Sequence, residues 1–453
     1  MATQANNTAV ISAWSRERTS KSCEQAWLAG ERTESSFFGP LRHLQLAFVS
    51  IALLLPLIVL PGLQQPFSRP KLVLWVIVVL CGLARCGSGL SGAWKSLPAT
   101  LQTALVLWLG ALGASATWGV FASPESLFLA LTGVGWLLVL MAVRPRPERL
   151  AGALVLSGVV VAAVAVAQSL RLDPFRMFGW LPDITTGPRM RVFATLGNPD
   201  FVAAFLCGLL PLIFAFRSHI RGGRWLRTTS IILLILAILA TGSRAPIPGL
   251  VCALLWVIGL KRRKLWGALA LAALCVSILA VTLSPARSLR TTLRGRAYIA
   301  KVSAPHLAEH WLLGLGPGGF GAVFPAWEAQ YWKVPRDHRD RQFAGFEDHA
   351  ENDYLEIVAD TGLAGLLAFA TVLFALLRQA WFGARAAGDH LIAGASAGMV
   401  ALMAVALVDF PFMRPAESFL FWSLAAVSLV AQDTSRASHE PVRSHGQIAN
   451  EGE

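Results

Sequence analysis

A short run of ionisable and amide side chains, Asp-His-Ala-Glu-Asn-Asp-Tyr-Leu-Glu at residues 348–356, precedes a long apolar stretch. Asp348 followed three residues later by Glu351 resembles a capping box, so we expect a helix to begin at this point. Side chains spaced i, i+4, i+7 and i+11 share one face of a helix. Four ionisable residues have that spacing: His349, Asp353, Glu356 and Asp360. The sequence therefore predicts a polar face where the chain enters an apolar segment.

The chemistry that suits this face is proton transfer. Histidine takes up a proton near neutral pH, and a neighbouring carboxylate orients the ring and stabilises its cation. Ionisable groups at the mouth of a membrane bundle are functional candidates by default. A structural alternative stays open, in which the acids complement the dipole at a helix start and the histidine is incidental.

Arginine side chains near the ends of apolar stretches form a second group of candidates. Arg191 lies before one stretch, Arg244 lies in a turn between two, and Arg414 lies in a later turn. A cluster follows another stretch: Arg287, Arg290, Arg294 and Arg296. The planar guanidinium donates two parallel hydrogen bonds to phosphate, so these residues favour an anionic ligand. The alternative is contact with lipid headgroups or with carboxylates of the same loops.

The composition indicates which elements must position these side chains. Of 453 residues, 55% are hydrophobic and 14% are charged, which is too few charges for the surface of a soluble protein of this length. Apolar runs without strand alternation recur along the chain, so we expect membrane-spanning helices. In such a protein a net charge of +13 indicates cytoplasmic loops and contact with anionic lipids, not nucleic acid. The 6 cysteines have neither disulfide nor zinc spacing.

Hydropathy predicts about twelve spans. They cover residues 44–60, 72–83, 101–120, 126–143, 150–167, 201–216, 229–240, 247–260, 265–283, 354–377, 391–408 and 419–430. Basic residues concentrate in alternate connections, at 144–149, 217–227 and 261–264, which places these connections and both termini in the cytoplasm. Two long segments, 168–200 and 284–352, then face the opposite side of the membrane.

The topology divides the chain into five expected parts. These are a disordered cytoplasmic tail (1–40), nine transmembrane helices (41–283), a large, partly helical periplasmic loop (284–352), three further transmembrane helices (353–430) and a second cytoplasmic tail (431–453). Two motifs within them are interpreted as turns. The glycine-rich run at 314–319 fits GxGxxG spacing, but no βαβ unit surrounds it, so we expect a tight turn and no dinucleotide site. Asn198-Pro199-Asp200 is typical of a turn that starts a span.

In their order and spacing, these motifs resemble the O-antigen ligase/polymerase family. The resemblance rests on Gly-Asn-Pro-Asp at 197–200, Ser-Arg at 243–244, the glycine-rich turn at 315–320, and residues 349–356 with the trailing Thr-Gly-Leu-Ala-Gly at 361–365. It covers roughly residues 189–377. Glu351 stands where the family often has a second histidine, and Asp200 stands where asparagine is common.

The resemblance implies an all-α polytopic fold similar to lipid-donor membrane glycosyltransferases, with an active site on the periplasmic side of the bacterial inner membrane. The implied reaction is inverting, metal-independent transfer of a glycan from undecaprenyl pyrophosphate to a sugar hydroxyl of a glycan or lipid A-core acceptor, with no cofactor. The expected partners are this donor, the acceptor and membrane lipids. The implied catalytic residues are His349, Glu351 and Asp353; those for pyrophosphate are Arg191, Arg244, Arg294 and Arg296; those for substrate are Asn198, Asn352 and Tyr354.

Two other functions stay open at this point. An O-antigen or exopolysaccharide polymerase would extend the glycan itself, with another lipid-linked glycan as acceptor. A membrane transporter is the alternative of another class, and the sequence disfavours it because neither an inverted repeat nor a pair of broken helices is evident.

Overall fold

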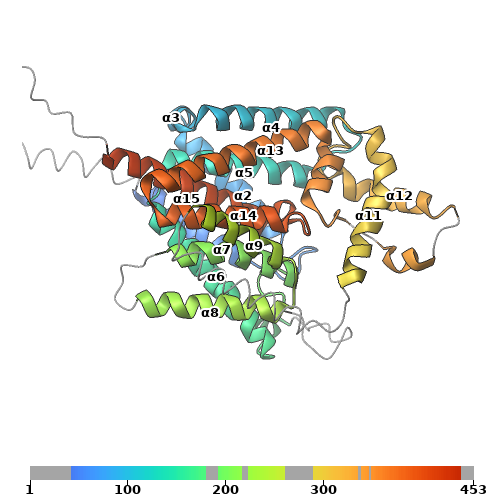
Figure 1. Cartoon of the computed structure of the whole chain (residues 1–453), viewed down its shortest axis with the longest axis horizontal. Coiled ribbons are helices and arrows are strands. Elements are labelled where there is room, and N and C mark those ends of the chain that lie inside the picture. The colour runs from blue at the N-terminus through green and yellow to red at the C-terminus, as the bar shows by residue number, and fades with distance from the viewer. Residues whose placement is uncertain are drawn as a thin grey trace, which may run out of the picture. The chain divides into compact units, whose positions relative to one another are not determined.

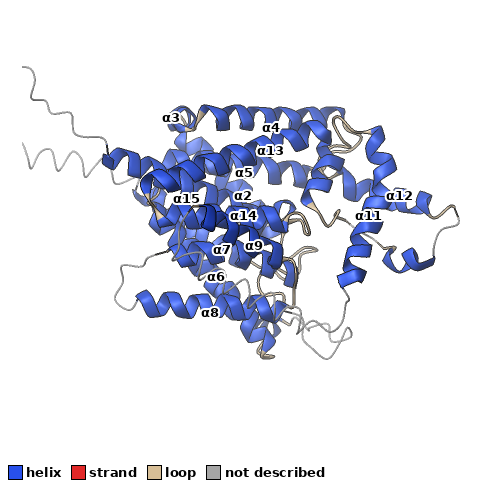
Figure 2. Ribbon diagram, in the orientation of Figure 1, coloured by secondary structure: helices blue, strands red, loops and turns tan. Residues whose placement is uncertain are grey.

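The computed structural model describes residues 42–179, 192–216, 223–260, 289–334, 338–345 and 348–439. The chain divides into two units, Met1–Phe48 and Val49–Glu453, and the candidate residues all belong to the second. The described part of this unit consists of α-helices and short 3-10 helices without any strand, as Figure 2 shows, which confirms the all-α prediction. The predicted tail at 1–40 and the predicted span at 265–283 lie outside the described residues.

The α-helices of the second unit are labelled in Figure 1, and the short 3-10 helices lie between them in the chain. In chain order they are η1 (Leu55–Leu57), α2 (Arg69–Cys86), α3 (Gly89–Ser96), α4 (Ala99–Trp118), α5 (Pro124–Val143), α6 (Pro147–Ser169), η2 (Pro174–Phe178), α7 (Pro199–Ala215), α8 (Gly223–Thr241), α9 (Pro246–Gly259), α11 (Leu289–Glu309), α12 (Gly319–Tyr331), η3 (His338–Phe343), α13 (Asp353–Ala387), α14 (His390–Val405), η4 (Pro411–Met413) and α15 (Pro415–His439).

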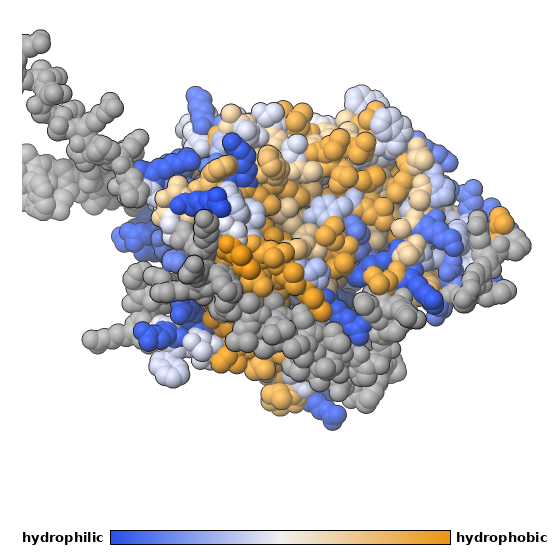
Figure 3. Space-filling view, in the orientation of Figure 1, coloured by the Kyte–Doolittle hydropathy of each residue, from blue (hydrophilic) through white to orange (hydrophobic). Residues whose placement is uncertain are grey.

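Within this described part, five helices are long and apolar enough to cross a membrane, namely α4, α5, α6, α8 and α13. The helices α2 and α3 pass the same test together, and they are bent by 103° where they meet. Figure 3 shows apolar side chains gathered over the middle of the helical bundle, with hydrophilic side chains towards both of its ends. The protein is therefore a polytopic helical membrane protein, and the count of about twelve spans stays a prediction.

Polar caps explain why several helices begin before the predicted apolar spans. α5 begins with Pro124 after Ser123, whose hydroxyl accepts a hydrogen bond from the Ser126 N–H. α14 follows Asp389, whose carboxylate accepts one from the Leu391 N–H at 2.7 Å. A side-chain oxygen at this position satisfies a backbone N–H that has no partner within the helix. Hydropathy alone does not register these polar first turns.

Small residues let α14 lie close to α7. A Cβ on Gly398 would collide with the carbonyl oxygen of Gly208 in α7, and one on Gly394 would collide with the side chain of Ala215. Small residues four apart are the usual means by which membrane helices approach backbone to backbone. This contact fixes α14, which also packs against α9 and α15, and α14 leads directly into the connection that borders the candidate site.

A break in α13 separates its polar start from its apolar remainder. Gly362 has φ 67° and ψ −172°, a backbone conformation that glycine adopts without a steric cost. The two N–H groups released by the break, those of Leu363 and Ala364, donate to the carbonyls of Trp311 at 2.8 Å and Leu312 at 3.2 Å. The first two turns of α13 are thereby tied to the segment between α11 and α12, which Figure 1 shows at one end of the bundle.

Candidate functional site

The loop before α13, residues 348–352, carries the candidate base His349 and is called the base loop. The helix begins at Asp353, and its N-cap is Asn352, whose side-chain oxygen accepts a hydrogen bond from the Leu355 N–H at 3.0 Å. The predicted capping box of Asp348 and Glu351 is therefore wrong. The chain reverses just before the cap, because Glu351 has a φ of 54°. His349 thus precedes the helix and does not share a helical face with the acids of α13, as its spacing had predicted.

The reversed loop folds back onto the first turns of α13 and brings His349 to Glu356. The Nδ1 atom of His349 lies 2.7 Å from Oε1 of Glu356, and the backbone N–H of Ala350 donates to Oε2 of the same carboxylate at 3.0 Å. Glu356 is buried, whereas the His349 side chain keeps 37% of its surface exposed. An ionised carboxylate only accepts hydrogen bonds, so it assigns the proton of a neutral imidazole to Nδ1 and leaves Nε2 as the acceptor.

The electrostatic surroundings favour the protonated form of His349. Burial alone would lower its pKa, but the charge of Glu356 and its hydrogen bond outweigh burial and raise the pKa above the ordinary value. Arg414 opposes this rise and Asp348 adds to it. A histidine in this setting can take a proton from a hydroxyl and hold it as a stabilised cation.

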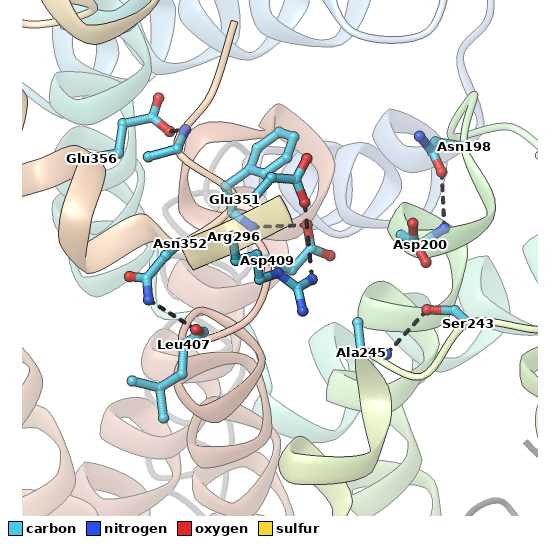
Figure 4. A network of polar contacts seen from close by, with 12 residues as sticks. Asn198, Asp200, Ser243, Ala245, Arg296, Glu351, Asn352, Glu356, Leu407 and Asp409 are labelled. Atoms are coloured by element: carbon cyan, nitrogen blue, oxygen red, sulfur yellow. Dashed lines mark hydrogen bonds and ion pairs between the residues drawn. The ribbon is translucent and has the colours of Figure 1, made fainter. Parts of the chain in front are cut away.

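Two of the predicted substrate residues anchor this loop to α14. The Asn352 Nδ2 donates to the carbonyl of Leu407 at 2.8 Å, as Figure 4 shows. The Tyr354 hydroxyl donates to the carbonyl of Met403 at 2.9 Å. Both side chains therefore hold the start of α13 against the end of α14, and their predicted contact with substrate stays a prediction.

Asp353, predicted to be catalytic, faces the connection between α14 and α15. It is fully buried, and its Oδ2 accepts a hydrogen bond from the Phe412 N–H at 2.8 Å. Its own N–H lies within hydrogen-bond distance of two carbonyls, those of Ala406 and Asp409. The carboxylate in contact with His349 is thus Glu356, which the sequence placed on the polar face but did not single out as a site residue.

The glycine-rich segment is the predicted tight turn, and Asp360 holds it. The two carboxylate oxygens of Asp360 accept hydrogen bonds from the backbone N–H groups of Gly318 at 2.7 Å and Phe320 at 2.9 Å. Gly314, Gly316 and Gly318 have φ values of 70°, 105° and 75°. The turn begins α12 and fixes the start of that helix against α13.

A family comparison can now be set beside this geometry. Residues 229–370 match the family model described as O-Antigen ligase. These residues are therefore similar to an O-antigen ligase domain. Among curated proteins, no match was found. The finding confirms the resemblance that the motifs carried to the O-antigen ligase/polymerase family.

The matched segment, residues 229–370, includes both the base loop and several of the predicted arginines. Arg296 on α11 lies 3.9 Å from the Glu351 carboxylate, and Figure 4 shows the two side chains together. Arg294, on the same helix, is exposed. Arg244 lies partly exposed in the turn between α8 and α9, where the Ala245 N–H donates to the Ser243 hydroxyl at 3.2 Å. Arg191 and Arg287 lie outside the described residues.

Two regions outside the matched segment also lie near His349. Asn198 caps α7, as predicted for a turn that starts a span, because its side chain accepts a hydrogen bond from the Asp200 N–H at 3.0 Å. In the first turn of α7, Phe201 packs edge-on against Phe410, with ring centroids 5.8 Å apart. The Phe410 ring in turn stacks on His349 at a centroid distance of 4.2 Å. The start of α7 and the α14–α15 connection therefore border the base.

A cleft of about 60 Å³ lies beside the first turns of α13. Its walls come from α4, α5, α13 and α15 and are mostly apolar, with Trp108, Leu129, Phe369 and Trp422 among the lining residues. Asp360 and Pro317 of the glycine-rich turn also line it. The cleft is thus a mostly apolar space between helices, next to the helix turn that carries Glu356.

Proposed function

We propose that the protein transfers a glycan from undecaprenyl pyrophosphate to a sugar hydroxyl, at the periplasmic face of the bacterial inner membrane. The observation that carries the proposal is the contact between His349 and Glu356 within the segment similar to an O-antigen ligase domain. A partly exposed imidazole whose Nδ1 is held by a buried carboxylate is the arrangement that a general base needs.

In the proposed reaction, Nε2 of His349 takes the proton of the acceptor hydroxyl. The acceptor oxygen attacks the anomeric carbon of the donor as the bond from that carbon to the pyrophosphate oxygen breaks. Attack from the face opposite the leaving group inverts the anomeric centre. Glu356 stabilises the imidazolium that forms, and base catalysis of this kind contributes roughly 10²–10⁴-fold to the rate.

Arginine side chains are proposed to bind the pyrophosphate leaving group. Negative charge grows on it as the glycosidic bond breaks, so fixed guanidinium groups stabilise the transition state more than the bound donor. Arg296 supports this role because it reaches the base loop, and its buried Nε lacks a hydrogen-bond partner among the residues that the structure describes. We assign Arg191, Arg244 and Arg294 to the same role on the basis of the sequence.

The apolar cleft is proposed to hold part of the polyprenyl tail. It lies between apolar helices, and Pro317 of the glycine-rich turn lines it, so a bound isoprenoid would bring its pyrophosphate towards that turn. Ligase and polymerase share this donor chemistry and differ only in the acceptor. The family match supports both, and we favour the ligase reaction onto a glycan or lipid A-core acceptor.

Membranes supplied with labelled lipid-linked glycan test the proposal. His349→Ala should reduce transfer by roughly 10²–10⁴-fold while the protein stays in the membrane. His306→Ala is the matched control, because His306 on α11 stacks on Trp327 of α12 and has no role in the proposed reaction, so this change should leave transfer unchanged. Full transfer by the His349 variant would refute the proposed base. Label that crosses the membrane without joining an acceptor would indicate a transporter instead.

A further inference from the structure

A buried ion cluster lies behind the base and takes no part in the reaction proposed above. Arg414 lies 3.0 Å from the Asp409 carboxylate and 3.2 Å from that of Glu417. All three side chains are at most 4% exposed. The sequence had marked Arg414 as a candidate for an external anion, but carboxylates of the chain itself compensate its charge. A buried charge requires such partners.

The guanidinium of Arg414 also lies against two aromatic rings. Its Cζ atom is 3.9 Å from the centroid of Phe201 and 4.8 Å from that of Phe410. A guanidinium is planar and packs on aromatic faces in a way that the ammonium group of lysine does not reproduce. Arg414 therefore fixes the side chain of Phe410 between the start of α7 and the base loop.

Phe410 in turn supports the face of the His349 imidazole. The two rings are 4.2 Å apart between centroids and inclined by only 20°. The backbone of Phe410 is held as well, because its N–H donates to Oδ1 of Asp409 at 2.9 Å. Glu356 fixes one ring nitrogen of His349, and Phe410 fixes the plane in which the ring lies.

We propose that Phe410 and Arg414 are positioning residues, which hold the His349 imidazole in one plane so that Nε2 points towards the acceptor site. The role in catalysis rests on the proposed function, but the restraint on the ring does not. A ring held only through Nδ1 can swing about that hydrogen bond. Contact with a flat aromatic face removes this motion, and small displacements of a reacting group carry a large cost in rate.

The charges around His349 supply a second readout. Glu356 and Asp348 favour its protonated form, whereas Arg414 opposes it from behind Phe410. Replacement of Arg414 by a neutral residue should therefore move the protonation of His349 to higher pH. A change at Phe410 leaves all three charges in place, so it should alter the orientation of the ring more than its titration.

The experiment compares Phe410→Leu with Phe412→Leu in the full-length protein in lipid nanodiscs. Both residues lie on the same connection and are 8% exposed, but Phe412 packs on Phe369 and Phe421 and makes no ring contact with His349 among the described residues. Phe410→Tyr keeps the ring. The first readout is the rate at which diethylpyrocarbonate modifies His349, measured by peptide mass spectrometry across pH. The second is kcat and KM with lipid-linked glycan donor.

Phe410→Leu should speed the modification of His349 by roughly 2- to 12-fold, the factor that corresponds to loss of an aromatic pair. It should lower kcat by roughly 10- to 100-fold with little change in KM for the donor. Phe410→Tyr should behave like the unaltered protein. Phe412→Leu should leave the rate of His349 modification unchanged, and it is compared in that readout alone because Phe412 lines the apolar cleft proposed for the donor tail. Arg414→Lys loses the planar contact with Phe410, so it should lower kcat in the same direction as Phe410→Leu. It keeps the positive charge, so the pH midpoint of His349 modification should stay unchanged.

Unchanged modification of His349 in Phe410→Leu would overturn the proposal, as would equal rates of His349 modification in Phe410→Leu and Phe412→Leu. If Phe410→Leu speeds modification but no variant of His349 affects transfer, the restraint on the ring stands and the proposed base is wrong. The chemical readout does not depend on the donor, so the two failures can be told apart.

Discussion

Two carboxylate–cation contacts of the site differ in burial and in what they can do. Behind the base, Arg414 is 4% exposed and lies between two buried carboxylates. In the more exposed contact, here called the outer pair, Arg296 and Glu351 are 28% and 37% exposed and 3.9 Å apart. The first contact cannot open without leaving charge in an apolar interior, whereas solvent can replace either partner of the second.

The difference teaches that the same residue type serves two purposes in one site. The buried cluster of Arg414, Asp409 and Glu417 holds Phe410, the ring that packs on His349, in a fixed position. The outer pair joins α11 to the base loop through a contact that an incoming phosphate can displace. A pyrophosphate carries more charge than one carboxylate and accepts bidentate hydrogen bonds from a guanidinium. We therefore treat Arg414 as structural and Arg296 as a ligand residue, and the following changes test that distinction.

The largest expected effect is on stability, at Arg414. Arg414→Gln leaves Asp409 and Glu417 buried without a cation, which should destabilise the protein by roughly 3–5 kcal/mol. Thermal unfolding in nanodiscs, together with the amount of protein in the membrane, measures this loss. The double variant Arg414→Gln with Asp409→Asn should recover part of it. Normal stability of the single variant would mean that Asp409 and Glu417 do not depend on Arg414 to compensate their charge.

At Arg296 the expected effect is on the use of the donor and not on stability. In the proposed site, Arg296→Ala removes charge-assisted hydrogen bonds to the pyrophosphate, which contribute roughly 1.5–3 kcal/mol, so kcat/KM for the donor should fall by roughly 10- to 150-fold. Arg296→Lys should restore only part of the affinity, because an ammonium does not reproduce the planar fork. Unfolding temperatures should match those of the unaltered protein. If stability fell as much as it does for Arg414→Gln, the two contacts would not differ in kind.

The buried carboxylate of Glu356 extends the comparison to pH. Glu356→Gln should lower kcat by roughly 10- to 100-fold, a part of the base contribution. His349 works unprotonated, so activity is lost as the pH falls through its pKa, which Glu356 raises. Without that carboxylate the pKa falls, and the acid limb of the pH–rate profile should move to lower pH. A limb that stays in place would show that another group titrates there.

Sequence reasoning reached the helices of this protein more readily than the contacts of its site. Apolar stretches long enough to span a membrane predicted the cores of α4, α5, α6 and α13, because hydropathy is a property of the local sequence. Polar caps moved the helix starts by a few residues. The broken turn at Gly362 was not predicted, since a glycine within an apolar run gives no sign of the carbonyls that will receive the released N–H groups.

The candidate site was predicted in part. His349 and the acids of α13 were recognised from their types and spacing, but the helical register assigned to His349 was wrong because Asn352, and not Asp348, caps the helix. The partnership of His349 with Glu356 arises from the chain reversal at Glu351, where a non-glycine residue takes a positive φ. Arg414 could not be told from the outer arginines by sequence, because its carboxylate and aromatic partners depend on how α7 packs against the α14–α15 connection.

The smallest expected effect concerns Glu351, and it has the opposite sign to the others. Its carboxylate lies near Arg296, and in the proposed site it competes with the donor for that guanidinium. Exposed pairs of this kind contribute roughly 0–1 kcal/mol, so Glu351→Gln should lower KM for the donor by up to about fivefold. The dependence of KM on salt should weaken as well, because one competing charge is gone.

Glu351 is also the rival of His349 for the role of base, and the same variant separates the two roles. A competitor for Arg296 predicts a lower KM with kcat nearly unchanged. A catalytic carboxylate predicts loss of kcat by orders of magnitude, since glutamine cannot accept the proton. Glu351→Asp provides the control, because it keeps the charge but shortens the reach towards Arg296. Parallel loss of kcat in Glu351→Gln and His349→Ala would make the two residues one proton-handling unit, and the outer pair would then be part of the catalytic machinery.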